Sequence, residues 1–249
     1  ELCTYNIAGV DLNMGCPAPR IYRKNVGGGL LREPEKVDKI LGELRQAVTG
    51  IPLTVKMRVG FENTDTFYEI LDIINRHNID LLSLHGRTVK DMYHGAVNYD
   101  LIADAVKRVD CPVLANGNIH SATTALEVLE KTRAAGVMVG RWAIGNPWIF
   151  NQIRQALRSE PITPVPLVEV RNYIERLWQT PNKDNFPVQS RLGYLKMFLN
   201  YIALLVDAEG HFLRLMRKTS TEVELFNLCD SVLLSDSTKT FALAPYLGL

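Results

Sequence analysis

Five polar clusters in this sequence each follow directly after a short apolar run. They are NMGCP at 13–17, KMR at 56–58, HGR at 85–87, NG at 116–117 and GR at 140–141. A thiol and an imidazole can donate or accept protons, and amine and guanidinium groups bind anions or electron-rich rings. The clusters therefore suit proton transfer on a bound anionic ligand, provided that the fold brings them together.

Cys16 is the first candidate for a catalytic side chain. A thiol in a loop after a strand can act as a nucleophile or as a proton donor. Gly15 lets the backbone approach a ligand, and Pro17 stiffens the loop. A cysteine taken alone is more often a small buried apolar side chain, but this position favours function. The other cysteines are interpreted as structural: Cys3, Cys111 and Cys229.

Lys56 and Arg58 stand two residues apart, so they lie on the same side of a predicted strand. A lysine that points into a core is costly unless it faces an anion or an electron-rich ring. The alternative is a lysine that extends from the strand end to water. A single histidine is more often structural than catalytic. However, His85 ends the next predicted strand, which places it near Lys56 at the same edge.

The last two clusters favour a phosphate-bearing ligand. Loops after the final strands of a barrel commonly bind phosphate through backbone N–H groups, and Asn116, Gly117, Gly140 and Arg141 occupy such loops. Residues 27–29 are three glycines without the Lys-Ser/Thr of a phosphate loop. We interpret them as a flexible loop beside Cys16.

Alternating strand and helix patterns position these clusters. Nearly continuous apolar runs predict parallel strands covered on both faces at 9–12, 52–57, 80–84, 112–115 and 136–139. Helical spacing predicts helices at 33–48, 66–78, 99–109 and 121–132. This order is typical of βα units. Polar residues at the end of every strand favour a (β/α)8 barrel over an open sheet, although only five of its eight strands are present.

After residue 149 the pattern changes, and from residue 168 it is purely helical. Three prolines mark a linker, and helices are predicted at 170–179, 188–206, 210–218 and 221–234. Residues 151–218 hold ten Lys and Arg against six Asp and Glu, a net charge of +4, which suits a polyanionic partner. We therefore predict two domains, a partial barrel at 1–160 and an all-helical domain at 161–249.

Overall composition excludes several classes of protein. The 249 residues carry 28 Lys and Arg against 27 Asp and Glu, which excludes a histone-like polycation and an acidic tail. No apolar run reaches the roughly 18–20 residues of a membrane span. The four cysteines form no C-x-x-C pair, so neither a disulfide scaffold nor a zinc ribbon is expected. We expect a cytoplasmic monomer without metal or membrane contact.

Seven motifs in sequence order resemble the tRNA-dihydrouridine synthase family of FMN-dependent barrels. They are DLNMGCP (11–17), GGLL (28–31), VKMR (55–58), LHGRT (84–88), YHGAVNY (93–99), ANGNI (115–119) and VGR with GNPW (139–148). The matching motifs lie close together over residues 6–158. The C-terminal part resembles the family only in being helical. The cysteine loop together with HGRT is specific, because other flavin barrels share only the phosphate-binding end.

The resemblance implies a role for each candidate residue. Reduced FMN would deliver hydride to C6 of a flipped-out uracil, NADPH would be the reductant, and Cys16 would supply the proton at C5. The helical tail would bind tRNA. FMN would be held by Lys56, His85, Asn116, Gly117, Gly140 and Arg141. The uracil or its approach would be handled by Asn13, Arg58 and Tyr93.

The beginning of the chain departs from the family pattern. The family has three further βα units before this point, and the sequence starts at Glu1, so we expect an N-terminally truncated fragment that is inactive in isolation. Two alternatives stay open. One is another FMN-dependent barrel oxidoreductase that acts on a small molecule. The other is a non-catalytic RNA-binding fragment of a barrel.

Overall fold

The computed structural model describes residues 5–180 and 187–248, which form two compact units. The first contains the described residues up to Ile119 together with Glu127–Met138. The second contains His120–Leu126 and the described residues from Val139 onward. Cys3 lies outside the described residues. The predicted functional division after residue 160 stays a prediction.

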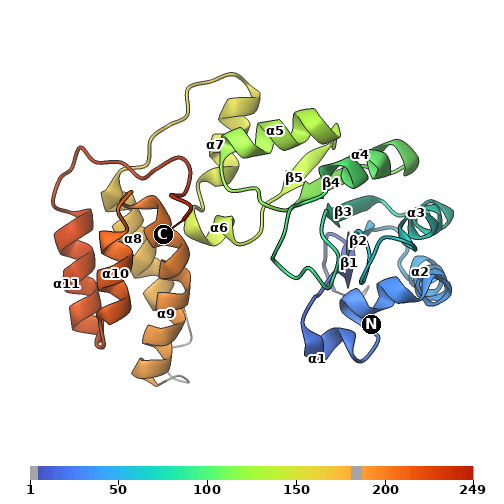
Figure 1. Cartoon of the computed structure of the whole chain (residues 1–249), viewed down its shortest axis with the longest axis horizontal. Helices are drawn as coiled ribbons and strands as arrows, with labels where there is room; N and C mark the ends of the chain where they lie inside the picture. The colour runs from blue at the N-terminus through green and yellow to red at the C-terminus, as the bar shows by residue number, and fades with distance from the viewer. Residues whose placement is uncertain (1–4, 181–186, 249) are drawn as a thin grey trace. The chain divides into compact units, whose positions relative to one another are not determined.

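The first unit is built on a parallel sheet of five strands in sequential order (Figure 1). The strands are β1 (Val10–Met14), β2 (Leu53–Arg58), β3 (Leu81–His85), β4 (Val113–Asn116) and β5 (Gly136–Met138). The predicted α/β class with a parallel sheet is therefore confirmed. Its identity as part of a (β/α)8 barrel stays a prediction.

Helices connect successive strands. They are α1 (Pro19–Tyr22), η2 (Gly27–Arg32, a 3-10 helix), α2 (Pro34–Ala47), α3 (Phe67–Arg76), α4 (Tyr99–Arg108) and α5 (Ala122–Thr132). Helix α2 begins at Pro34. Proline is tolerated there because an N–H group in the first turn of a helix has no acceptor within the helix. The Asn98 side chain caps α4 by accepting hydrogen bonds from the N–H groups of Asp100 and Leu101. In Figure 1, α2, α3 and α4 lie along one side of the sheet.

The two faces of the sheet differ in chemistry. Met57, Leu84 and Ala115 are fully buried on the face that the helices cover. In β1 and β2 the alternate residues are polar and more exposed, as Asn13 and Lys56 illustrate. The expectation that the strands are apolar on both faces is therefore wrong for β1 and β2. Alternation of apolar and polar residues is already visible in their sequences, VDLNM and LTVKMR.

The glycine-rich segment at 27–29 lies beside Cys16, as predicted, but it is not a loop. It forms the start of η2, and Gly28 and Gly29 are buried. A Cβ atom on Gly28 would lie 2.6 Å from a Val89 methyl group and 2.7 Å from the Cys16 carbonyl oxygen. These glycines therefore permit close packing, and the expectation of flexibility is wrong.

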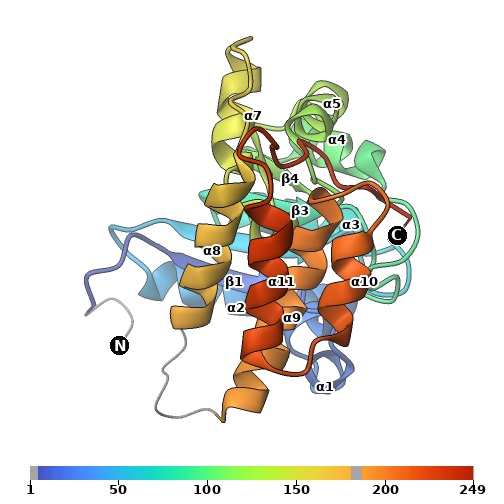
Figure 2. The same ribbon diagram turned by 90° about the vertical axis from the view of Figure 1, so that its left-hand side faces the viewer.

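The second unit contains helices α6 (Trp142–Gly145), α7 (Ile149–Leu157), α8 (Leu167–Gln179), α9 (Val188–Ile202), η4 (Ala203–Leu205), α10 (His211–Lys218) and α11 (Glu222–Leu233). The sequence predicted α8 to α11 but missed α6 and α7. Figure 2 shows α8, α9, α10 and α11 side by side, and neighbouring pairs are in contact. No helix in the described part of the chain has the length and apolar character that crossing a membrane requires.

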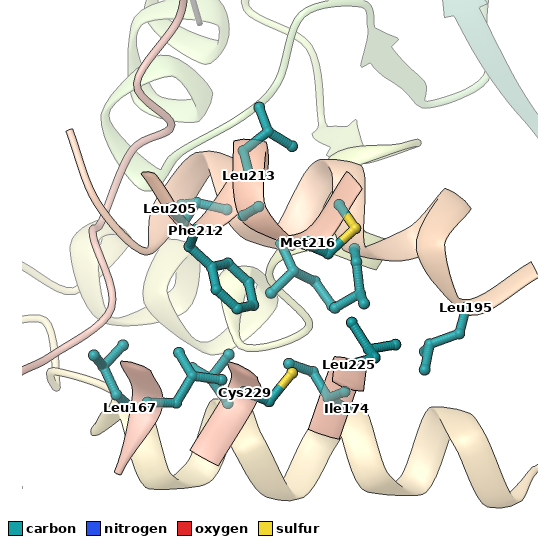
Figure 3. Packing of buried hydrophobic residues seen from close by; sticks show 14 of the residues in the cluster. Leu167, Ile174, Leu195, Leu205, Phe212, Leu213, Met216, Leu225 and Cys229 are labelled. Atoms are coloured by element: carbon teal, nitrogen blue, oxygen red, sulfur yellow. The ribbon is translucent and has the colours of Figure 1, made fainter. Parts of the chain in front are cut away.

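The helices α8 to α11 share one apolar core. Ile174, Leu195, Phe212 and Leu225 each come from a different helix and pack into the same cluster (Figure 3). Cys229 is fully buried in it, and burial raises the pKa of its thiol to about 12. A thiol that stays protonated is a poor nucleophile, so Cys229 has the structural role that the sequence predicted.

Candidate functional site

Two rows of side chains cross the polar face of the sheet. Strand register pairs Asn13 with Lys56 and Lys56 with Ser83, which forms the first row. It also pairs Arg58 with His85 and His85 with Asn116, which forms the second row two residues further on. Residues two apart on a strand share a face, and neighbouring strands lie about 4.8 Å apart. The sheet therefore brings five predicted site residues together and adds Ser83.

The loop that carries Cys16 is held by three hydrogen bonds. The Asn13 side-chain oxygen accepts from the Gly15 N–H at 2.9 Å. The Gly15 carbonyl accepts from Arg58 Nε at 3.1 Å, and the Cys16 carbonyl accepts from the Gly28 N–H at 3.1 Å. The thiol itself is free and only partly buried. It is therefore accessible on a backbone that cannot move freely.

Arg58 joins two loops at the end of the sheet. Its side chain is buried, and besides Gly15 it donates a hydrogen bond from Nη1 to the Thr88 carbonyl at 2.7 Å. Its guanidinium carbon lies 5.6 Å from the centre of the Tyr93 ring, which is half exposed. Burial lowers the pKa of Arg58, although a guanidinium stays charged in proteins. Arg58 therefore links the cysteine loop to the loop that bears Tyr93.

A second buried arginine fixes the Tyr93 loop, and the sequence analysis missed its role. Arg87 Nε and Nη2 donate to the Gly95 carbonyl at 3.0 and 2.6 Å. Arg87 Nη1 and Nη2 also donate to the Asn118 side-chain oxygen at 3.3 and 3.2 Å. These bonds attach the loop to the turn that follows β4. Its acceptors lie far apart in the sequence, so no local pattern indicates this role.

Lys56 is partly buried, and nearby negative charge compensates its burial only in part. Burial is the main cause that lowers the pKa of its ammonium group, and Arg58 adds to the effect. Asp11 and Cys16 raise that pKa but do not cancel the shift. Within the described residues Lys56 makes no ion pair, so its charge is available to a ligand. An anionic or electron-rich ligand here would stabilise the ammonium form.

His85 is buried and its ring is oriented by the backbone. The Arg87 N–H donates a hydrogen bond to His85 Nδ1 at 3.2 Å. A neutral imidazole whose Nδ1 accepts a hydrogen bond carries its proton on Nε2. In that tautomer Nε2 is the donor, and the ring lies between Arg58 and Asn116 in the strand register.

The turn after β4 has a backbone that only glycine tolerates. Gly117 has φ +125°, and a Cβ atom there would lie 2.9 Å from both methyl groups of Val97. The Asn116 side chain donates to the Met138 carbonyl at 2.8 Å, and the Tyr99 hydroxyl donates to the Gly117 carbonyl at 2.8 Å. The Asn116 amide therefore holds β5 in place. Whether this turn binds a phosphate stays a prediction.

Gly140 and Arg141 belong to the second unit, directly before α6. Arg141 is the N-cap residue of that short helix. Apart from its chain neighbours, no described residue has an atom within 4 Å of the position that a Gly140 Cβ would occupy, so packing alone does not require this glycine. No group of three or more His, Cys, Asp or Glu side chains that could hold a metal ion occurs in residues 5–180 and 187–248.

A family model and the curated relatives of this sequence agree on one family. A family model described as dihydrouridine synthase matches residues 3–236. The chain is 37% identical over 169 residues to tRNA-dihydrouridine synthase B of Proteus vulgaris, covering 67% of this chain and 52% of that protein. It is 39% identical over 167 residues to the protein of the same name from Escherichia coli K12, covering 66% and 52%. The chain thus spans about half the length of the curated relatives that it matches.

One solved structure, a FabK mutant from Thermotoga maritima, is similar over 86% of this chain and 73% of that chain. Its sequence identity is 14% and its TM-score is 0.21, values too low to support any argument about function.

Proposed function

The chain belongs to the dihydrouridine synthase family, and we propose from this premise that the protein reduces uridine to 5,6-dihydrouridine in tRNA. The observation that carries the proposal is the polar face of the sheet. There, Lys56 lies without an ion pair in the row next to His85, and the Cys16 loop is bonded to Arg58. A proton donor and an uncompensated cation on one face suit the reduction of a ring beside a bound cofactor.

The residues present fit FMN as the cofactor. Among the described residues, the Lys56 ammonium makes no ion pair and the buried Ser83 hydroxyl lacks any hydrogen-bond partner. Both deficits would be relieved by the acceptor atoms of a flavin ring. Asn116, Gly117, Gly140 and Arg141 are the residues that we propose for the phosphate group. When bound, FMN would supply the hydride, with NADPH as the reductant.

We assign the proton-transfer step to Cys16. Its thiol would donate a proton to C5 of the uracil, and its fixed backbone would keep the sulfur in one position. Asn13, Arg58 and Tyr93 would orient the base, which must leave the tRNA stack to reach a buried ring. Arg58 would act partly through the loops that it joins, because two of its donors already bind backbone carbonyls.

The proposal includes tRNA as the partner and the helical residues 161–249 as its binding domain. Within this domain the support comes from its first part, since residues 151–218 carry a net charge of +4 whereas residues 219–249 carry −3, and phosphate neutralisation dominates nucleic-acid affinity. A monomer in the cytoplasm, where tRNA is modified, completes the proposal.

The test is an assay of the full-length protein with unmodified tRNA, FMN and NADPH. Mass spectrometry of the digested tRNA should reveal nucleosides two mass units heavier than uridine, and their formation should require NADPH. Bound FMN without such nucleosides would contradict the proposal in favour of a reductase for small molecules. Binding of tRNA without FMN and without product would favour a non-catalytic RNA-binding module.

A further inference from the structure

Ser83 is a buried polar residue that the fold leaves unsatisfied. It lies in β3 and is only 6% exposed. Its hydroxyl oxygen has no hydrogen-bond partner among the described residues. A buried hydroxyl without a partner destabilises the folded state, because its hydrogen bonds to water are lost and not replaced. Native proteins rarely keep such a group unless water or a ligand satisfies it.

The register of the sheet places Ser83 inside the candidate site. Ser83 is the direct neighbour of Lys56 on β2, and it precedes His85 by two residues on the same face of β3. Lys56 also lacks an ion pair among the described residues. Two adjacent strands thus present two polar groups, about 4.8 Å apart at the backbone, that the protein does not satisfy.

A second hydroxyl on the same face shows the contrast. Thr54 stands two residues before Lys56 on β2 and therefore shares its face. Its hydroxyl donates a hydrogen bond to the Asp11 carboxylate at 2.7 Å. The missing partner is therefore specific to the level of Lys56 and is not a general property of this face.

The chemistry of the two groups defines their ligand. An ammonium group only donates hydrogen bonds, whereas a serine hydroxyl donates one and accepts others. Two donors side by side match a ring edge that presents a carbonyl oxygen next to a ring nitrogen. We propose that Ser83 is a second hydrogen-bond donor to the flavin ring edge that Lys56 contacts. This inference rests on the proposed binding of FMN.

The test compares Ser83→Ala, Ser83→Thr and Thr54→Ala in the full-length protein. Each variant is measured for its free energy of unfolding without FMN and for its FMN dissociation constant by flavin fluorescence. Ser83→Ala should be more stable than wild type without FMN, because the unsatisfied hydroxyl is gone. It should also bind FMN about tenfold more weakly, as expected for one lost hydrogen bond.

The other two variants are controls. Ser83→Thr keeps the hydroxyl and should keep the affinity, which separates the hydrogen bond from side-chain volume. Thr54→Ala removes a hydroxyl that has a partner, so it should lower stability and leave FMN binding unchanged.

Two results would overturn the role of Ser83. One is wild-type FMN affinity in Ser83→Ala, and the other is lower stability of the FMN-free Ser83→Ala protein, which would indicate a structural role. A folded wild-type protein that binds no FMN would instead refute the proposed function, and this is visible before any substitution is made.

Discussion

The two faces of the sheet follow opposite rules. On the face covered by helices, Met57, Leu84 and Ala115 are fully buried and apolar, and these side chains contribute to packing. On the polar face, Lys56 and Ser83 are buried in whole or in part without partners in the described structure. Apolar packing therefore stabilises the fold on one face, while the other carries, at the level of Lys56, two groups whose burial opposes folding. Such local conflicts are expected at functional sites.

Cys16→Ala should have the largest effect and should separate the faces most clearly. Loss of a general acid lowers a rate by about 10²–10⁴-fold. Dihydrouridine formation in a single turnover should fall by this factor, whereas the free energy of unfolding should barely change, because backbone bonds hold the loop. Cys111→Ala is the matched control and should retain activity, because Cys111 lies just before β4, at the end of the strand away from the candidate site. A Cys16→Ala protein with normal turnover would contradict the assignment.

Leu84→Ala, on the face covered by helices, should have the next largest effect, and this effect should be on stability. Removing a fully buried leucine lowers the free energy of unfolding by about 2–5 kcal/mol. Urea denaturation measures this loss. The fraction that remains folded should bind FMN normally, since Leu84 points away from the polar face. A large loss of FMN affinity in the folded fraction would show that the two faces are not independent.

Asn118→Ala tests whether hydrogen bonds to Arg87 hold the Tyr93 loop in place, in contrast to the unpartnered groups at the level of Lys56. The substitution removes a hydrogen-bond acceptor of the buried Arg87 guanidinium. We expect the free energy of unfolding to fall by about 1–3 kcal/mol. Limited proteolysis should then cut within 88–97 faster than in wild type. Asn151→Ala, which removes an exposed acceptor of Arg154, is the control and should leave the cleavage rate unchanged. Equal cleavage in Asn118→Ala and wild type would show that other contacts hold the loop.

Lys56→Met should have the smallest effect on stability, and it should make the protein more stable. Removing a partly buried charge without an ion pair should raise the free energy of unfolding at neutral pH by about 0.5–2 kcal/mol. Burial lowers the pKa of Lys56 from its ordinary value of 10.5. Between the lowered and the ordinary pKa, the unfolded chain binds more protons, so wild-type stability should rise with pH in that window. This rise should be smaller in Lys56→Met, and an equal rise would contradict the account.

Strand and helix positions were predictable because their patterns are local. The apolar runs that predicted the strands and the helical spacing over 33–48 depend only on neighbouring residues, although the alternation in VDLNM and LTVKMR was not used. Helices α1, α6 and η2 are too short to show such a period, and tight packing against Val89 gives η2 its glycines. Short helices of this kind therefore need tertiary information.

That these polar residues lie together on the sheet was predictable, but their hydrogen bonding was not. Polar residues at strand ends identified Cys16, Lys56 and His85 as residues that one edge brings together. Ser83 has no sequence pattern of its own, because a small polar residue in an apolar strand is common. Its importance appears only from strand register and from the lack of a partner, which depend on the whole fold.

The most direct test of the central claim is FMN titration of the wild-type and Lys56→Met proteins, followed by flavin fluorescence. Thermal unfolding of the same samples confirms that both are folded. The account predicts that wild type binds FMN and that Lys56→Met, although at least as stable, binds at least tenfold more weakly. A folded Lys56→Met protein with wild-type FMN affinity would contradict the claim that the polar face of the sheet is the ligand-binding face.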